Sequence, residues 1–277
     1  MFSLQAILEG THNFSIDRKL GEGAFGVVYK ADIHRTPFAV KLLKKVVMIS
    51  KPQKRSEIAL NLRLRHPNVL ELAGFCLEQD NCCLVYHFMP NGSLEDRLHR
   101  GKGDGPLLWR TRLEIAEGAA RGLQYLHTAQ KDPVIHGDIK SANILLDSHC
   151  QAKLGDFGIA RMGPFLGVHR YTYVRSAEMR GTKMYLQPNK LGEYVGDWGL
   201  ILFGAPVLLE LLTGSWVDRE AAGIEKDEVE DALDSDEVGT VSERMFDRSA
   251  GPYPRSQATD VLRLACKCLD KRKKRPE

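Results

Sequence analysis

Residues 134–147 read VIHGDIKSANILLD, so a carboxylate (Asp138), an ammonium (Lys140) and an amide (Asn143) fall within six positions. Apolar residues stand on both sides, and the run NILL is typical of a strand. Apolar flanks of this kind become buried and hold a short polar loop on a rigid base. The stretch therefore predicts a polar loop on an anchored base, in which Asp138 is the candidate to orient a hydroxyl nucleophile and accept its proton.

The neighbouring polar groups fit the transfer of a phosphoryl group. Lys140 would neutralise the charge of that group, and Asn143 would bind a metal ion through its amide oxygen. A second metal ligand, Asp156, follows in KLGDFGIAR at residues 153–161. Two hard oxygen ligands together with phosphate oxygens suit Mg²⁺. His136 resembles a candidate base, but we expect it to pack and to hydrogen-bond the backbone.

A glycine-rich stretch, GEGAFGVVYKA at residues 21–31, places Gly21, Gly23 and Gly26 in a G-x-G-x-x-G spacing. Dinucleotide-binding enzymes use the same spacing, but there the glycines open a helix. Here they run into VVYKADI, which is β-branched and predicts a strand. The pattern favours a glycine hairpin whose backbone N–H groups approach phosphates, and it argues against a dinucleotide oxidoreductase.

Lys41 in FAVKLL extends this phosphate site. At this distance beyond the glycine hairpin, its ammonium would reach the α- and β-phosphates of a nucleotide. A carboxylate would then have to hold the ammonium in place. Glu57, on the inward face of the predicted helix SEIALNLRLRH, is the candidate partner.

Composition limits the remaining possibilities. The chain has 277 residues, 43% apolar and 27% charged, which is ordinary for a globular protein with a sizeable core. A net charge of +3 is too small to argue for nucleic acid as a main partner. The six cysteines form no C-x-x-C pair, and isolated thiols fit a reducing cytosol. The longest apolar run, 14 residues from Gly199, is too short to span a bilayer and predicts a buried helix. The N-terminal residues do not have the pattern of a signal peptide, so we expect none.

The pattern of elements changes near residues 89–92. Before this point, FGVVYKADI, PFAVKLL and CCLVYHF predict strands around one helix. After it, SLEDRL opens with a serine cap, and RTRLEIAEGAARGLQYLH predicts a long amphipathic helix. The chain therefore divides into a strand-rich part and a helical part.

Taken in order, these motifs resemble a eukaryotic protein kinase domain over residues 15 to about 185. THNFS, MPNGSLEDRL, YLHTAQ and HGDIKSANILLD are similar to the interleukin-1-receptor-associated kinase and Pelle group, with plant receptor-like kinases as near relatives. The resemblance implies an α+β fold with two lobes. Residues 1–14 form an N-terminal extension and 15–277 the kinase domain. Within it the N-lobe covers about 15–89, the hinge about 87–92 and a truncated C-lobe about 93–277.

The resemblance also implies functional details. Asp138-x-Lys140 is the form of serine/threonine kinases, with ATP and Mg²⁺ as cofactors and protein hydroxyls as substrates. A signalling adaptor or receptor complex of the innate-immune type would be the partner, in the cytoplasm, with no nucleic acid and no membrane insertion. The implied nucleotide-site residues are Leu20, Gly21, Gly23, Gly26, Val28, Ala39, Lys41, Glu57, Tyr86 as gatekeeper beside the adenine, and Met89 in the hinge.

The activation segment carries hydroxyls among arginines in HRYTYVRSAEMRGT, residues 169–182. Thr172 and Ser176 are candidate phosphosites, whereas Thr182 is expected to be structural. Most members of the family carry arginine where this chain has Gly137, and that arginine pairs with a phosphorylated activation loop. Without this charge, loop phosphorylation should depend less on the one contact.

Several C-lobe positions depart from the family pattern. Pro188 is followed by Asn189 where the family has glutamate, so Arg275 would lose its charge partner at a cost of about 3–5 kcal/mol. The register around Asp197 is shifted, and Pro206 would cost about 3 kcal/mol unless it lies in the first turn of its helix. Two hypotheses follow: an active serine/threonine kinase, or a kinase-like scaffold that binds nucleotide or partners with little transfer.

Overall fold

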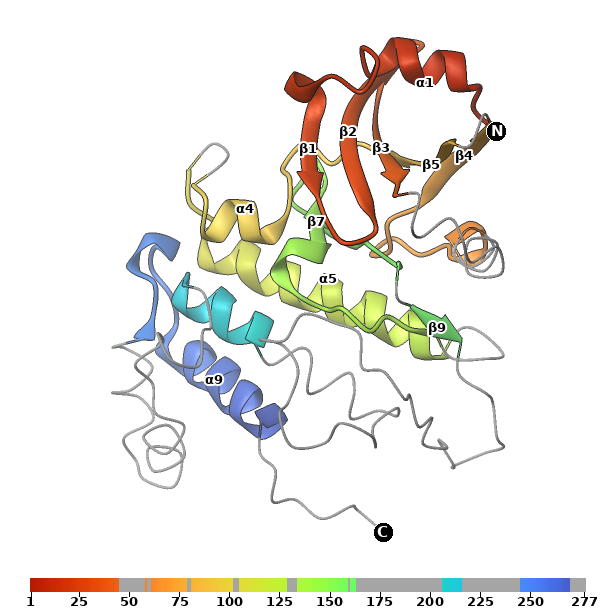
Figure 1. Ribbon diagram of the computed structural model, residues 1–277. Helices are drawn as coiled ribbons and strands as arrows, with labels where there is room; N and C mark the ends of the chain where they lie inside the picture. Colours follow the sequence, from red (N-terminus) through yellow and green to blue (C-terminus); the bar gives the residue numbers. More distant parts are fainter. Residues whose placement is uncertain are drawn as a thin grey trace.

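The computed structural model describes residues 1–44, 58, 61–78, 81–101, 105–128, 134–158, 160–162, 206–215 and 245–269. Within these ranges the chain forms two lobes, an antiparallel sheet and a mostly helical part below it (Figure 1). This confirms the predicted α+β fold. The elements are α1 (Leu4–Gly10), η1 (Ile16–Arg18), β1 (Lys19–Glu22), β2 (Gly26–Ile33), β3 (Thr36–Leu43), β4 (Leu72–Glu78), β5 (Asn81–His87), α4 (Leu94–Leu98), α5 (Trp109–Thr128), β6 (Val134–Ile135), η2 (Ser141–Asn143), β7 (Ile144–Leu146), β8 (Ala152–Leu154), β9 (Arg161–Met162), η4 (Arg248–Ala250) and α9 (Arg255–Leu269).

The N-lobe sheet has five strands in the order β1-β2-β3-β5-β4. β1 and β2 pair antiparallel, so the glycine stretch is a hairpin between strands, as its sequence predicts. β2 and β3 join through the two-residue turn His34–Arg35, and both residues take a positive φ as this kind of hairpin requires. The register places Val28 opposite Lys41 and Ala39 opposite Tyr86. Strand pairing thus gathers the predicted nucleotide-site residues of three strands.

The N-terminal residues pack onto this sheet. The hydroxyl of Ser3 caps α1 by accepting a hydrogen bond from the N–H of Ala6. Leu4 and Ile7 are buried in one apolar cluster with strand residues that include Val40. The N–H of Phe2 donates to the carbonyl of Phe75 in β4 (3.0 Å). Residues 2–10 therefore cover one face of the sheet, which their sequence did not indicate.

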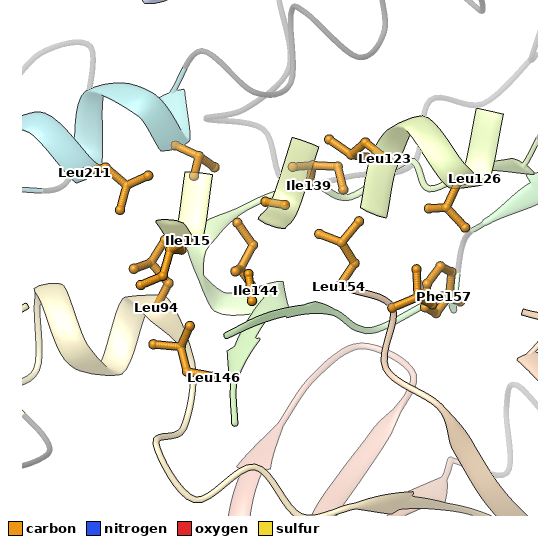
Figure 2. Packing of buried hydrophobic residues seen from close by; sticks show 14 of the residues in the cluster. Leu94, Ile115, Leu123, Leu126, Ile139, Ile144, Leu146, Leu154, Phe157 and Leu211 are labelled. Atoms are coloured by element: carbon orange, nitrogen blue, oxygen red, sulfur yellow. The ribbon is translucent and has the colours of Figure 1, made fainter. Parts of the chain in front are cut away.

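The C-lobe core forms where α5 meets β7 and β8 (Figure 2). Ile115, Ala119, Leu123 and Leu126 recur at spacings of three or four and are all buried, so they define one face of the predicted amphipathic helix. This face packs against a set from the catalytic-loop region: Ile139, Ile144, Leu146, Leu154 and Phe157. Burial of one leucine contributes about 1.5–3 kcal/mol, so the loop lies on a well-anchored base.

A second helical layer lies below α5 (Figure 1). Residues 206–213 are helical, and the buried Leu211 and Leu212 confirm a buried helix in the apolar run. Pro206 is the first described residue of this helix and is itself buried. Among the described residues, no helix is both long and apolar enough to cross a membrane.

Candidate active site

The catalytic loop brings Asp138, Lys140 and Asn143 into direct contact. Lys140 Nζ lies 2.8 Å from Asp138 Oδ2. Asn143 Nδ2 donates to the carbonyl of Asp138 (2.8 Å) and to its Oδ2 (3.0 Å). The amide nitrogen of Asn143 is therefore directed at Asp138 and is used in holding that residue. The structure thus brings the three predicted groups together.

His136 supports this loop from within the core. Its Nε2 donates to the carbonyl of Gly155 (2.8 Å), and its Nδ1 accepts from the N–H of Asp138 (3.3 Å). This pattern requires a neutral imidazole with its proton on Nε2. Burial lowers the pKa of His136, although the hydrogen bond to Gly155 and two nearby carboxylates act in the opposite direction. The ring also packs against Phe157, with centroids 4.9 Å apart. The predicted packing and hydrogen-bonding role of His136 is confirmed.

Gly137 takes a φ of +82°, in the left-handed region that side-chain-bearing residues rarely adopt. The sequence indicates only that Gly137 lacks the arginine charge that most of the family carries at this position. The backbone supplies a reason for the glycine itself, because the turn between His136 and Asp138 is made easily by glycine alone.

Lys41 and Asp156 form the other half of the site. Lys41 Nζ lies 2.6 Å from Asp156 Oδ1, although the two residues are 115 positions apart in sequence. Burial tends to raise the pKa of Asp156, but the charge of Lys41 and its hydrogen bond outweigh burial and hold that pKa below its ordinary value. Asp156 is ionised at neutral pH. It also has a φ of +59°, a conformation that aspartate tolerates better than most residues.

Gly155 links the two halves of the site. Its N–H donates to the carbonyl of Asn143 (2.9 Å), and its own carbonyl accepts from His136. The residue next to Asp156 is thus tied by its backbone to both ends of the catalytic loop. The structure brings Asp138, Asn143 and Asp156 together through these bonds.

The glycine hairpin lies above the Lys41–Asp156 pair. The N–H of Gly23 donates to the carbonyl of Gly26 (2.9 Å) and closes the turn. A Cβ on Gly26 would lie 2.5 Å from the carbonyl oxygen of Leu42, so packing alone requires glycine there. At Gly21 and Gly23, an added Cβ would meet no described atom within 4 Å. The described fold thus gives no packing reason for these two glycines.

The predicted adenine end combines the sheet with β7. Tyr86 is buried, and Ala39 and Met89 pack against the apolar cluster that contains it. Leu145 packs against the same cluster from the C-lobe side, and the sequence reasoning missed it. The alternation in β7 could have identified it, because Ile144 and Leu146 face the C-lobe core and Leu145 faces the other way. Leu20 is exposed and Val28 half-buried on β1 and β2.

Several predicted residues lie outside the described part of the chain. These are Glu57, Thr172, Ser176, Thr182, Pro188, Asn189, Asp197 and Arg275. The described residues contain no cluster of three or more His, Cys, Asp or Glu side chains that could hold a metal ion. Two oxygen ligands from Asn143 and Asp156, with phosphate oxygens or water as further ligands, would suit Mg²⁺.

Comparison with known proteins adds independent findings. The protein kinase domain family matches residues 14–276. Interleukin-1 receptor-associated kinase 1 of Bos taurus is 37% identical, over 98% of this chain and 43% of its own length. The Pelle-like serine/threonine-protein kinase pik-1 of Caenorhabditis elegans is 38% identical, over 89% and 54%. The probable serine/threonine-protein kinase PBL3 of Arabidopsis thaliana is 38% identical, over 97% and 65%. The chain thus spans about half the length of these animal relatives.

Proposed function

This chain belongs to the protein kinase domain family, and on that basis we propose that it transfers the γ-phosphate of ATP to serine or threonine hydroxyls of proteins. The observation that carries the proposal is the ion pair between Lys41 and Asp156, at 2.6 Å, held beside the Asp138–Asn143 contact by Gly155. A lysine for phosphate, an acid for metal and an acid for the hydroxyl proton are the three groups that phosphoryl transfer needs.

Each catalytic-loop residue has one proposed task. Asp138 orients the substrate hydroxyl and accepts its proton, and Lys140 neutralises charge on the transferring group. Asn143 and Asp156 would hold Mg²⁺, which would offset the negative charge of the phosphates. The ionised state of Asp156 supports this role, because a hard cation needs an anionic oxygen. Glu57 is proposed to position Lys41, as the sequence predicts.

The nucleotide is proposed to lie between the hinge and the glycine hairpin. Gly21 and Gly23 support this, because the described fold leaves open space where their side chains would be, and phosphates need close approach to backbone N–H groups. The proposed set is Leu20, Gly21, Gly23, Gly26, Val28, Ala39, Lys41, Tyr86 and Met89. Leu145 joins them, since it packs against the same apolar cluster as Ala39 and Met89.

The biological setting is proposed from the relatives. An interleukin-1 receptor-associated kinase and a Pelle-like kinase are among them, which supports a role in innate-immune-type receptor signalling, in the cytoplasm, with an adaptor or receptor complex as partner. We also propose that the chain divides into an N-terminal extension, residues 1–14, and a kinase domain, residues 15–277.

One assay tests transfer itself. The purified chain is incubated with γ-labelled ATP and Mg²⁺, and phosphate is measured on the chain and on a generic protein substrate. The parent is expected to transfer phosphate. Asp138→Asn is expected to abolish transfer while ATP binding is nearly unchanged, because Asp138 acts only when a hydroxyl approaches the γ-phosphate. If Asp138→Asn transfers as fast as the parent, the mechanism is wrong.

The alternative function is a scaffold that binds nucleotide without transfer. The sequence feature in its favour is Pro188–Asn189, where the family carries a glutamate. A parent chain that binds ATP with Mg²⁺ but transfers no phosphate would establish this alternative.

A further inference from the structure

Phe25, at the tip of the glycine hairpin, is turned inward over the phosphate end of the site. Its half-buried ring lies so close to Gly158 that a Cβ on that glycine would be 3.0 Å from ring atom Cδ2. Lys41 Nζ lies 5.7 Å from the ring centroid, within cation–π range. The carbonyl of Phe25 accepts from the N–H of Lys44 (3.0 Å), so its backbone is tied to the end of β3.

Further bonds hold the hairpin in this closed position. Glu22 pairs with Lys44 (2.7 Å) and with Lys19 (2.9 Å). These hydrogen bonds, from Lys44 and then Lys19, lower the pKa of Glu22 to about 2, so the carboxylate is ionised at any physiological pH. The hairpin that carries Phe25 is therefore tied to β3 by the Glu22–Lys44 pair and by the backbone bond of Lys44.

The groups beneath the ring already bind each other. Lys41 and Asp156 are in direct contact, at 2.6 Å. In the proposed function each has a different partner, a phosphate for Lys41 and Mg²⁺ for Asp156. A phosphate beside Lys41 would lie beneath the ring, so ATP with Mg²⁺ would have to lift the ring that lies on Gly158 and above Lys41.

We propose that Phe25 closes the phosphate end of the site in the nucleotide-free chain, as a cover formed by its ring against Gly158 and above Lys41. The proposal rests on the proposed ATP-binding function. It makes Phe25 a residue that determines ligand preference, because only ligands with a phosphate chain must displace the cover. A nucleoside fills the adenine end and leaves the ring in place.

This selectivity distinguishes the cover from a general packing role. Without the ring, ATP no longer pays the free energy of displacing it, whereas adenosine binding never required that displacement. The lost cation–π contact alone is expected to tighten ATP binding about two- to fivefold. Loss of ordinary packing would instead change the affinities of both ligands together.

The test is calorimetric titration of the chain with ATP plus Mg²⁺ and, separately, with adenosine. We expect Phe25→Ala to bind ATP about two- to fivefold more tightly than the parent, with adenosine affinity unchanged. Phe25→Leu keeps an apolar side chain near Gly158 but loses the π face. Its ATP affinity should fall between those of the parent and of Phe25→Ala. The matched control is Phe14→Ala, because Phe14 packs on Tyr29 of β2 (5.3 Å between centroids) and against the apolar cluster beneath α1. It should change the ATP-to-adenosine ratio by less than either Phe25 variant.

The other outcomes overturn the proposal in distinguishable ways. An equal change for both ligands, or no change, in a chain that still transfers phosphate refutes the cover alone. Weaker ATP binding by Phe25→Ala means that the ring helps to hold the phosphates. A parent that binds neither ligand refutes both the cover and the proposed function.

Discussion

Arg112 of α5 connects three parts of the C-lobe, and its removal is the most informative perturbation of the frame. The residue is 2% exposed. Its Nη2 lies 2.5 Å from Asp247 Oδ2, its Nη1 donates to the carbonyl of Leu211 (2.9 Å), and its Nε donates to the carbonyl of Leu107 (2.8 Å). The Leu211 carbonyl belongs to the last turn of the helix at 206–213, where carbonyls have no partner within the helix.

The magnitude follows from these contacts. Arg112→Met keeps most of the apolar stem but removes every donor. Each buried acceptor left without its donor costs about 1–3 kcal/mol. Breaking a buried ion pair by removing one partner costs about 3–5 kcal/mol in all. Asp247 is partly exposed and also accepts from the N–H and hydroxyl of Ser249, so water and these bonds limit the loss to that range. At about 2–4 °C per kcal/mol, the melting temperature should fall by about 6–20 °C.

The assay is thermal unfolding followed by circular dichroism. Arg110→Met is the matched control on the same helix, because Arg110 is 91% exposed and pairs only with Glu114 among the described residues. That exposed pair contributes about 0.3–0.5 kcal/mol, so the control should shift the melting temperature by no more than about 2 °C. Equal shifts for the two variants would refute the claim that Arg112 holds the C-lobe layers together.

Three further predictions concern the site and its activation. Incubation with ATP should place phosphate on Thr172 or Ser176, as measured by mass spectrometry, and phosphate only on Thr182 would contradict the assignment. Gly137→Ala should lower the melting temperature, because alanine at a φ of +82° costs about 1–2 kcal/mol, and an unchanged or higher value would show that the turn tolerates a side chain. The pKa of Asp156 lies below its ordinary value, so its pairing with lysine stabilises the fold at neutral pH and is lost as pH falls through the folded-state pKa. The difference in melting temperature between the parent and Asp156→Asn should therefore narrow on acidification, and a constant difference would exclude this linkage.

The local elements of this chain were largely predictable from its residues. The β-branched runs of β2, β3 and β5 and the amphipathic face of α5 carry their periods in the sequence itself. The capping box at Ser93 and Asp96 likewise begins α4 where the serine indicates. The short helix α1 was missed. Seven residues are too few to show a helical period, and this helix depends on packing against the sheet.

The sequence by itself determined which chemical groups the site contains. The order of glycine hairpin, lysine strand, HGDIKSAN and DFG indicated phosphoryl transfer because each motif carries its own residue types. Tertiary structure alone decided which groups meet. Lys41 contacts Asp156 across 115 positions, Leu145 packs against the same cluster as Met89, and Phe25 lies against Gly158. Gly137 has its backbone reason only in a turn that the whole loop imposes. Composition and spacing are local properties, whereas contacts between lobes arise from how the two cores pack, and no window of sequence contains that information.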